Sequence, residues 1–301
     1  MNLNLPKELL ICGSGASEAV PALFCDCELC RQAWKNGGKD IRSRTAYQLG
    51  DEIRIDFGPD SLLHRYRFNL HYENMRHLFI THPHKDHFSP LQMNYHVHGP
   101  LGPAILKDHI LTLHGTQQVI DQFQSGLAKD FSKMRMALDV LDPVRDTREL
   151  ENGIRVTGIA ANHFCPGALN YIFEMPDGFT FFIGTDTGRF KEETWAILKE
   201  FHFDMMILDG TAGLLDIDGG HCTAKQVRDI VARLRDEKII DEGTSLVTNH
   251  FAHCGGMLHK DLEEFYRPLG IEPGYDGMIV KLARDARCSS EQSLSHAQGA
   301  E

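Results

Sequence analysis

The six-residue stretch His82-Pro-His84-Lys-Asp86-His87 places three imidazoles and a carboxylate directly after the apolar run 78–80. Such a run predicts a buried strand, so the cluster begins where a strand ends and a loop starts. Imidazole and carboxylate are the usual ligands of Zn²⁺, Mn²⁺ and Fe. His82 and His84 are two residues apart, so in extended chain they point to the same side and can bind one ion. Asp86 and His87 follow the turn and can face a second ion, whereas the alternative is a solvated, histidine-rich loop.

Three more potential metal ligands follow strand-like segments further along the chain. His163 comes after the segment 154–156, Asp186 ends the apolar stretch 181–186, and His250 ends the stretch 245–250. In each case an apolar strand ends and a side chain able to bind metal comes next. The sequence therefore predicts that several strand ends contribute to one metal site.

Strand and helix patterns surround these residues. We expect an opening strand at 8–13, a hairpin formed by 45–49 and 52–56, and a strand at 205–209. The segments 191–200 and 224–236 predict amphipathic helices, with Thr223 as the N-cap of the second. The segment 89–135 predicts mostly helix with short strands.

The H-x-H-x-D-H pattern and the later ligands resemble the metallo-β-lactamase superfamily, over roughly residues 8–280. The resemblance implies an α/β fold, an αββα sandwich in a single domain, with a dinuclear metal site at one edge. It implies a ligand set for each ion and a bridging aspartate: His82, His84 and His163 for the first ion, Asp86, His87 and His250 for the second, and Asp186 between them. It also implies that Asp56 orients a metal-bound histidine. A turn-starting role before Gly58-Pro59 is the alternative for Asp56, and Asp209 is a further candidate for such an orienting role.

A second metal site is predicted near the N-terminus. Three thiols lie within six residues: Cys25, Cys27 and Cys30. This spacing is typical of a tetrahedral structural Zn²⁺ that takes its fourth ligand from elsewhere in the chain. His253 is the favoured fourth ligand, since it lies three residues after His250, while Cys254 and Cys12 are weaker candidates. Reduced cysteines without metal are the alternative.

Charge and composition restrict the partners. The formal net charge is −11 and the chain has no run of Lys or Arg, whereas proteins that bind long nucleic acids usually carry a basic surface. No apolar stretch approaches the length of a membrane span. Residues 1–7 lack the pattern of a signal peptide, which predicts a cytoplasmic protein with reduced cysteines. We therefore expect a small substrate, no long nucleic acid and no membrane partner, and we leave a homodimer open.

The cysteine motif, the I-D-x-G strand end and the closing H-x-x-H together resemble the PhnP-like phosphoribosyl cyclic phosphodiesterase branch of the superfamily. That resemblance implies hydrolysis of a small phosphodiester of the cyclic ribose type by a hydroxide bridging two metal ions. It implies two Mn²⁺ or Zn²⁺ ions, or Fe, at the active site, and one structural Zn²⁺. Asp186 would set the spacing of the ions, and His221 would contact the scissile phosphate and protonate the leaving oxygen. The alternative for His221 is a simple surface histidine.

Other functions remain open at this point. A PqqB-like oxygenase, a tRNA 3′-processing nuclease and a non-catalytic metal-binding protein are compatible with parts of the pattern. We expect residues 1–288 to form the hydrolase domain, with the cysteine-rich zinc loop near its N-terminus. The polar segment 289–301 predicts a disordered tail.

Overall fold

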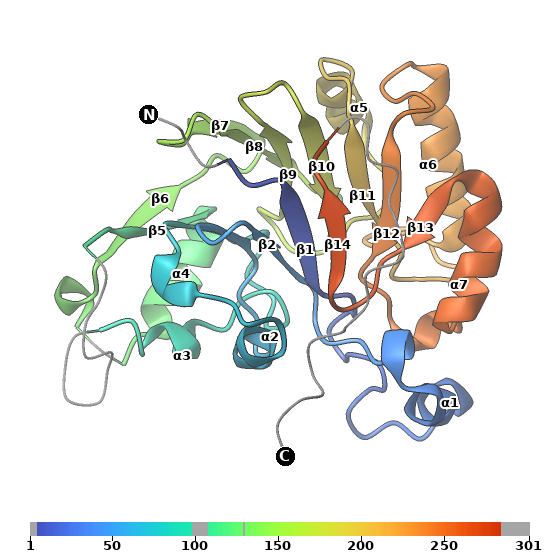
Figure 1. Ribbon diagram of the computed structural model, residues 1–301, viewed down its shortest axis with the longest axis horizontal. Coiled ribbons are helices and arrows are strands. Elements are labelled where there is room, and N and C mark those ends of the chain that lie inside the picture. The colour runs from blue at the N-terminus through green and yellow to red at the C-terminus, as the bar shows by residue number, and fades with distance from the viewer. Residues whose placement is uncertain (1–4, 98–107, 129, 284–301) are drawn as a thin grey trace.

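A computed structural model describes residues 5–97, 108–128 and 130–283 (Figure 1). It contains two seven-stranded sheets. The first sheet has the order β14 (Met278–Lys281), β1 (Glu8–Gly13), β2 (Ala46–Leu49), β3 (Ile53–Ile55), β4 (His77–Phe79), β5 (Leu111–Gly115) and β6 (Met136–Val140). The second has the order β13 (Ile271–Pro273), β12 (Ser245–Asn249), β11 (Met205–Asp209), β10 (Thr180–Gly184), β9 (Leu169–Glu174), β8 (Arg155–Ala160) and β7 (Arg145–Glu149).

Helices lie outside the pair of sheets, so the layers are helix, sheet, sheet and helix (Figure 1). The helices are α1 (Glu28–Asn36), α2 (Ser61–Phe68), α3 (Pro90–Met93), α4 (Gln117–Ser125), α5 (Glu192–Leu198), α6 (Ala224–Asp236) and α7 (His259–Tyr266). In Figure 1, α2, α3 and α4 lie beside the first sheet, and α5, α6 and α7 lie beside the second. The predicted αββα sandwich is confirmed.

Apolar side chains fill three layers. The central core lies between the sheets and includes Phe79 of the first sheet and Tyr171, Phe173 and Phe181 of the second. One outer core packs α5, α6 and α7 on the second sheet, and another packs α3 and α4 on the first. The strands contribute apolar residues to both faces because both faces of each sheet are covered.

The direction of the strands explains where the functional side chains gather. The strands β3, β4 and β5 run parallel in the first sheet, and β10, β11 and β12 run parallel in the second. The strand β8 also runs in the direction of β10, because both are antiparallel to β9. The carboxyl ends of parallel strands meet at one edge of a sheet, which is where ligands bind in open α/β sheets.

The patterns predicted several elements correctly. The opening strand, the hairpin of β2 and β3, the strand β11 and the helices α5 and α6 are present, and Thr223 caps α6 through a capping box. The segment 89–135 holds α3, α4, β5 and a short 3₁₀ helix in its described part. The predicted tail at 289–301 lies outside the described residues. Within the described ranges, no helix is both long and apolar enough to cross a bilayer.

Candidate metal centre and active site

Three candidate residues adopt a left-handed backbone just after a strand. The φ angles are +62° at Asp56 after β3, +55° at Asp186 after β10 and +68° at His250 after β12. For a residue other than glycine this conformation costs about 1–3 kcal/mol, and such strain is concentrated at functional sites. The sharp turn lets each side chain project from the strand end toward the cluster of candidate ligands.

The first group of donor atoms is formed by His82, His84, His163 and Asp186. Nδ1 of His84 lies 2.9 Å from Nε2 of His82 and 3.1 Å from Nε2 of His163. Oδ2 of Asp186 lies 3.0 Å from Nε2 of His82 and 3.3 Å from Nε2 of His163. Four donor atoms from three loops therefore converge on one point.

The second group is formed by Asp86, His87, His250 and the same Asp186. Nε2 of His87 lies 3.1 Å from Nε2 of His250, 3.2 Å from Oδ2 of Asp86 and 3.3 Å from Oδ2 of Asp186. Oδ2 of Asp186 thus belongs to both groups. The structure places all seven residues of the predicted dinuclear set in the two predicted groups, with Asp186 in the shared position.

Threonine hydroxyls determine how two of these histidines face the site. Oγ1 of Thr81 donates a hydrogen bond to Asp56, at 3.0 Å, and lies 3.0 Å from Nδ1 of His82. A hydroxyl has one hydrogen to donate, so it accepts from the Nδ1–H of His82. Nε2 of His82 is then unprotonated, with its lone pair directed into the first group.

The same arrangement recurs at the second group. Oγ1 of Thr211 donates to Oδ2 of Asp209 at 2.8 Å and lies 2.7 Å from Nδ1 of His250. The Asp209 carboxylate also accepts the backbone N–H of Asp186 and of Cys222. Asp209 therefore holds both a candidate ligand and the backbone of the shared aspartate.

Two further ligands, His87 and His163, are oriented by a carboxylate and by a carbonyl. Asp56 Oδ2 lies 2.6 Å from Nδ1 of His87, and the Gly220 carbonyl lies 3.0 Å from Nδ1 of His163. Carboxylate or carbonyl partners of this kind hold a ligating imidazole in one tautomer. When both rings are neutral, Nε2 of His87 and Nε2 of His250 face each other as two lone pairs at 3.1 Å, so a proton or a metal cation is needed between them.

The protonation states suit the exchange of protons for metal. Burial and, to a smaller extent, the charge of nearby His87 together lower the pKa of His82 to about 4. Burial opposes ionisation of Asp186, but the charge of His250 and contacts with His221 hold its pKa well below the ordinary value. Burial also disfavours a charged His87, yet Asp86 and Asp56 raise its pKa well above normal. Metal binding releases protons from the ligands. A dication would therefore replace the proton that is favoured on His87.

The donor chemistry therefore fits two dications. The first group offers three imidazole nitrogens, the second offers two imidazole nitrogens and the Asp86 carboxylate, and an oxygen of Asp186 is common to both. Oδ1 of Asp186 and Nδ1 of His221 are buried and make no hydrogen bond of acceptable angle to the described residues, although they lie 2.9 Å apart. Nitrogen and oxygen ligands of this kind suit Zn²⁺, Mn²⁺ and Fe alike.

The cysteine cluster also assembles as a group of donors. The Sγ atoms of Cys25 and Cys27 lie 3.6 Å and 3.7 Å from Nδ1 of His253, and buried Cys30 completes the group. Contact with His253 lowers the pKa of Cys27 to about 6. All seven described cysteines are free thiols. Of the other candidates for fourth ligand, Cys254 is exposed and outside the group, and Cys12 is buried beside Arg54.

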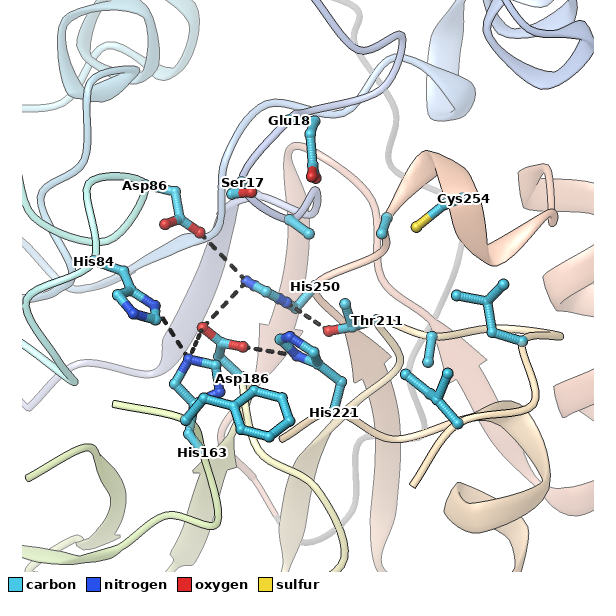
Figure 2. Close-up of a pocket in the computed structure, with 16 residues that line it drawn as sticks. Ser17, Glu18, His84, Asp86, His163, Asp186, Thr211, His221, His250 and Cys254 are labelled. Atoms are coloured by element: carbon cyan, nitrogen blue, oxygen red, sulfur yellow. Dashed lines mark hydrogen bonds and ion pairs between the residues drawn. The ribbon is translucent and has the colours of Figure 1, made fainter. Parts of the chain in front are cut away.

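His221 lies on the other side of Asp186 from the first group of ligands. It precedes α6, and its Nδ1 is the atom 2.9 Å from Asp186 Oδ1 (Figure 2). Burial disfavours its charged form, but contact with Asp186 and the charge of Asp209 raise its pKa above the ordinary value. The ring lines the adjoining pocket together with Asp186, so it is placed to contact a ligand bound there.

The pocket has a volume of about 320 Å³ and opens over both groups (Figure 2). It is lined by Ala16, Ser17, Glu18, His84, Asp86, His163, Phe164, Asp186, Thr211, Ala212, Leu215, Ile217, His221, His250, Ala252 and Cys254. The metal groups form its floor, and loops after β1, β8, β11 and β12 form its walls.

Gly58 is needed for the histidine loop to reach the site. A Cβ at Gly58 would overlap the carbonyl of Asp86, and the neighbouring Phe57 N–H donates to the carbonyl of His87. The I-D-x-G strand end therefore does two things: Asp56 orients His87, and Gly58 allows the loop to pack closely. The contacts of Asp56 support the orienting role that the resemblance implied. Asp56 also lies at a turn, as the alternative interpretation expected.

Sequence reasoning missed Thr81 and Thr211. Both hydroxyls lie between a buried carboxylate and a ligand Nδ1. The sequence did contain an indication for Thr81, because this residue directly precedes the candidate ligand His82. Thr211 and His250 are 39 residues apart, so only the packing of β11 beside β12 joins them.

Comparison with known proteins agrees with the geometry. A family model described as the β-lactamase superfamily domain matches residues 52–240, a range that includes His82 to Asp186 but ends before His250. A search of curated proteins found no match. The structure is similar to that of a diphosphatase from the PhnP family, with a TM-score of 0.70 and 20% identity over 92% of this chain and 98% of that one.

Two further structures share the fold. Zn²⁺-bound PqqB from Methylobacterium extorquens has a TM-score of 0.70 and 16% identity, over 91% of this chain and 100% of that one. Human tRNase Z, short form, has a TM-score of 0.61 and 16% identity, over 92% of this chain and 99% of that one. At these identities the likeness concerns the fold, and the fold family consists mostly of metal-dependent hydrolases. With the family model covering more than half of its length, the chain belongs to the β-lactamase superfamily.

Proposed function

We propose that this protein is a metal-dependent phosphodiesterase that hydrolyses a small phosphodiester of the cyclic ribose type. One observation carries the proposal: Asp186 presents Oδ2 to both donor groups and Oδ1 to His221, on the floor of an open pocket. A pair of metal sites joined by a carboxylate, with an acid beside it, suits in-line attack on phosphorus. The similarity to a diphosphatase of the PhnP family supports phosphoryl chemistry.

Different residues of the chain have different roles in the proposed reaction. Two bound dications would supply Lewis acidity and a water of lowered pKa for attack on phosphorus. Asp186 fixes the separation of the two groups, and Asp209 holds the Asp186 backbone in place. His221 keeps Nδ1 against Asp186, so its other ring nitrogen is available to donate a proton to the leaving oxygen.

The pocket favours a small substrate over the competing ligands. Its volume of about 320 Å³ is at the lower end of the range for small-molecule sites. With a net charge of −11, the chain is a poor match for a tRNA precursor, whose binding depends on neutralising many phosphates. The two groups joined by Asp186 also favour hydrolysis over the PqqB-like oxygenase and over a non-catalytic role.

For the cysteine cluster we propose one structural Zn²⁺. Its ligands would be Cys25, Cys27, Cys30 and His253, which fasten the start of α1 to the loop that follows His250. We also propose that the protein acts in the cytoplasm, where such closely spaced thiols stay reduced.

A substrate panel tests the function. Purified protein loaded with Mn²⁺, Zn²⁺ or Fe²⁺ is assayed with nucleoside 2′,3′-cyclic phosphates, an aryl phosphodiester, a β-lactam and a precursor tRNA. We expect turnover of the small phosphodiesters and little activity on the last two. Absence of phosphodiester turnover with all three metals contradicts the proposal.

A further inference from the structure

The pocket has an unusual charge distribution for a site that accepts a phosphodiester. Apart from the two donor groups and His221, Glu18 is the only charged residue that lines it among those the structure describes. No Lys or Arg of the described residues lines it. The dications would neutralise one phosphate at the floor, but the described part of the wall has no cationic side chain that could neutralise a second phosphate on the same substrate.

Glu18 is held at the rim by a well-anchored turn. The chain before it is fixed by the Ala16 N–H donating to the Phe251 carbonyl and by Arg44 donating to the Ser17 carbonyl. The exposed carboxylate of Glu18 has no ion pair or hydrogen bond to the described part of the chain. In Figure 2 it points into the space above His250. A carboxylate without a partner, on an anchored stretch of backbone, is suited to hydroxyl or amine groups of a ligand.

Another part of the pocket wall is apolar. Phe164 is 74% exposed, and Leu215 and Ile217 are 38% and 41% exposed, although all three line the pocket. The Phe164 ring lies edge-on to His221, with 6.3 Å between the ring centroids. A Cβ at Gly220 would overlap the Phe164 ring, so this glycine allows the aromatic side chain to lie there. Any leaving group protonated by His221 would contact this surface.

We infer that the preferred substrate carries the phosphodiester as its only anionic group, with hydroxyl or amine donors directed to Glu18 and an apolar or aromatic part against Phe164. The inference rests on the proposed function for its reaction and adds the class of substrate. A second phosphate would approach an unpaired carboxylate, and like charges placed together oppose binding. A nucleoside cyclic phosphate with a free 5′-hydroxyl has the required features.

A matched pair of substrates tests the inference. Adenosine 2′,3′-cyclic phosphate is compared with the same compound carrying a 5′-phosphate, in the metal-loaded enzyme. We expect kcat/KM to be higher for the singly charged compound by on the order of tenfold, as repulsion between exposed charges a few ångströms apart predicts. Glu18→Lys should remove or reverse the preference, and Glu18→Gln should give an intermediate value.

Glu242→Lys is the matched control. It makes the same change of charge at an exposed turn before β12, whereas the site lies after the end of that strand. This variant should keep the wild-type preference. An equal shift in the control would show an effect of net charge and would overturn the role of Glu18.

Binding separates failure of this inference from failure of the proposed function. Calorimetry with adenosine 3′-phosphate and adenosine 3′,5′-bisphosphate measures the same charge preference without turnover. A protein that hydrolyses neither substrate but binds the monophosphate more tightly, in a manner dependent on Glu18, contradicts the function and supports the inference. Equal or better use of the doubly phosphorylated compounds by the wild-type protein overturns the inference.

Discussion

Oγ1 of Thr211 lies 2.7 Å from Nδ1 of His250 and donates its own hydrogen to Asp209. Thr81 stands between Asp56 and His82 in the same way. Each group of donor atoms thus has its own chain of carboxylate, hydroxyl and imidazole. Because a hydroxyl that donates to the carboxylate must accept from the histidine, both chains leave Nε2 free to bind a cation.

Replacement of Thr211 tests this arrangement. Thr211→Val keeps the shape but removes the hydroxyl, so His250 loses the partner that holds its tautomer. We expect metal affinity to fall by about 10–100-fold, the usual effect of losing an outer partner. Competition with a chelator measures the affinity. Thr211→Ser keeps the hydroxyl and serves as the control, and unchanged affinity in the valine variant would contradict the proposed role.

Asp186→Asn tests the shared position. Asparagine tolerates the left-handed conformation at φ +55°, so the fold should be retained while the bridging charge is lost. We expect loss of turnover and of bound active-site metal, with an unchanged circular dichroism spectrum. Elemental analysis of the purified variant provides the count of ions, and retention of two active-site ions beside the structural Zn²⁺, with full activity, would rule out Asp186 as the bridge.

The cysteine cluster allows a comparison between neighbouring positions. Cys27→Ser should release one Zn²⁺ per chain and lower the melting temperature, because bound metal at a thousandfold excess over its Kd stabilises by about 4 kcal/mol. Cys254→Ser changes an exposed thiol outside the donor group and should leave both zinc content and melting temperature unaltered. If Cys27→Ser loses zinc without any change in melting temperature, the ion has no structural role.

Loss of His221 should depend on the leaving group. With a ribose-type cyclic phosphate, His221→Ala should lower kcat by roughly 10²–10⁴-fold, the range for general acid catalysis. An aryl phosphodiester has a leaving group that needs little protonation, so its kcat should fall much less. Parallel steady-state assays give the two ratios, and equal losses for both substrates would indicate phosphate binding in place of proton donation.

His259 predicts a dependence of stability on pH away from the metal sites. Burial and the charges of Arg42, Lys39 and Arg267 lower its pKa to about 3, and its Nδ1 lies 3.1 Å from Nη2 of Arg42. The unfolded chain, with a pKa near 6.5, binds this proton first as the pH falls. The folded state therefore loses stability below about pH 6.5, by about 2 kcal/mol at pH 5.

The test is a substitution that cannot titrate. Asparagine can accept the hydrogen bond from Arg42 without taking up a proton, so His259→Asn should lose less stability than the wild type between pH 7.5 and pH 5. Urea unfolding at several pH values measures the difference. Parallel curves for the two proteins would show that His259 does not contribute.

Much of the metal site could be predicted because its ligands lie in short, recognisable segments of the sequence. His82, His84, Asp86 and His87 occupy one loop, and His163, Asp186 and His250 each follow a strand. An apolar run indicates a buried strand, and parallel strands end at one edge, so the chain alone indicates that these side chains meet. By the same logic, three cysteines within six residues indicate a metal-binding loop.

The edge strand β7 was not predicted, for a physical reason. Its sequence Arg-Asp-Thr-Arg-Glu has neither an apolar run nor alternation, and none of its residues is buried. Its conformation comes from backbone hydrogen bonds to β8 and from charged side chains that suit the open edge of a sheet. Such a strand forms because it pairs with its neighbour β8, and the local sequence of β7 does not show this pairing.

The sequence by itself determined the ligand types, their order and the sheet edge where they gather, because these depend on strand periodicity and on residue chemistry. Only the tertiary structure decided which groups face one another. It placed Thr211 beside His250, His221 against Asp186, and Glu18 at the rim of the pocket. These pairings join segments that are distant in the chain, and they arise only when the two sheets pack face to face and bring their loops to the same edge.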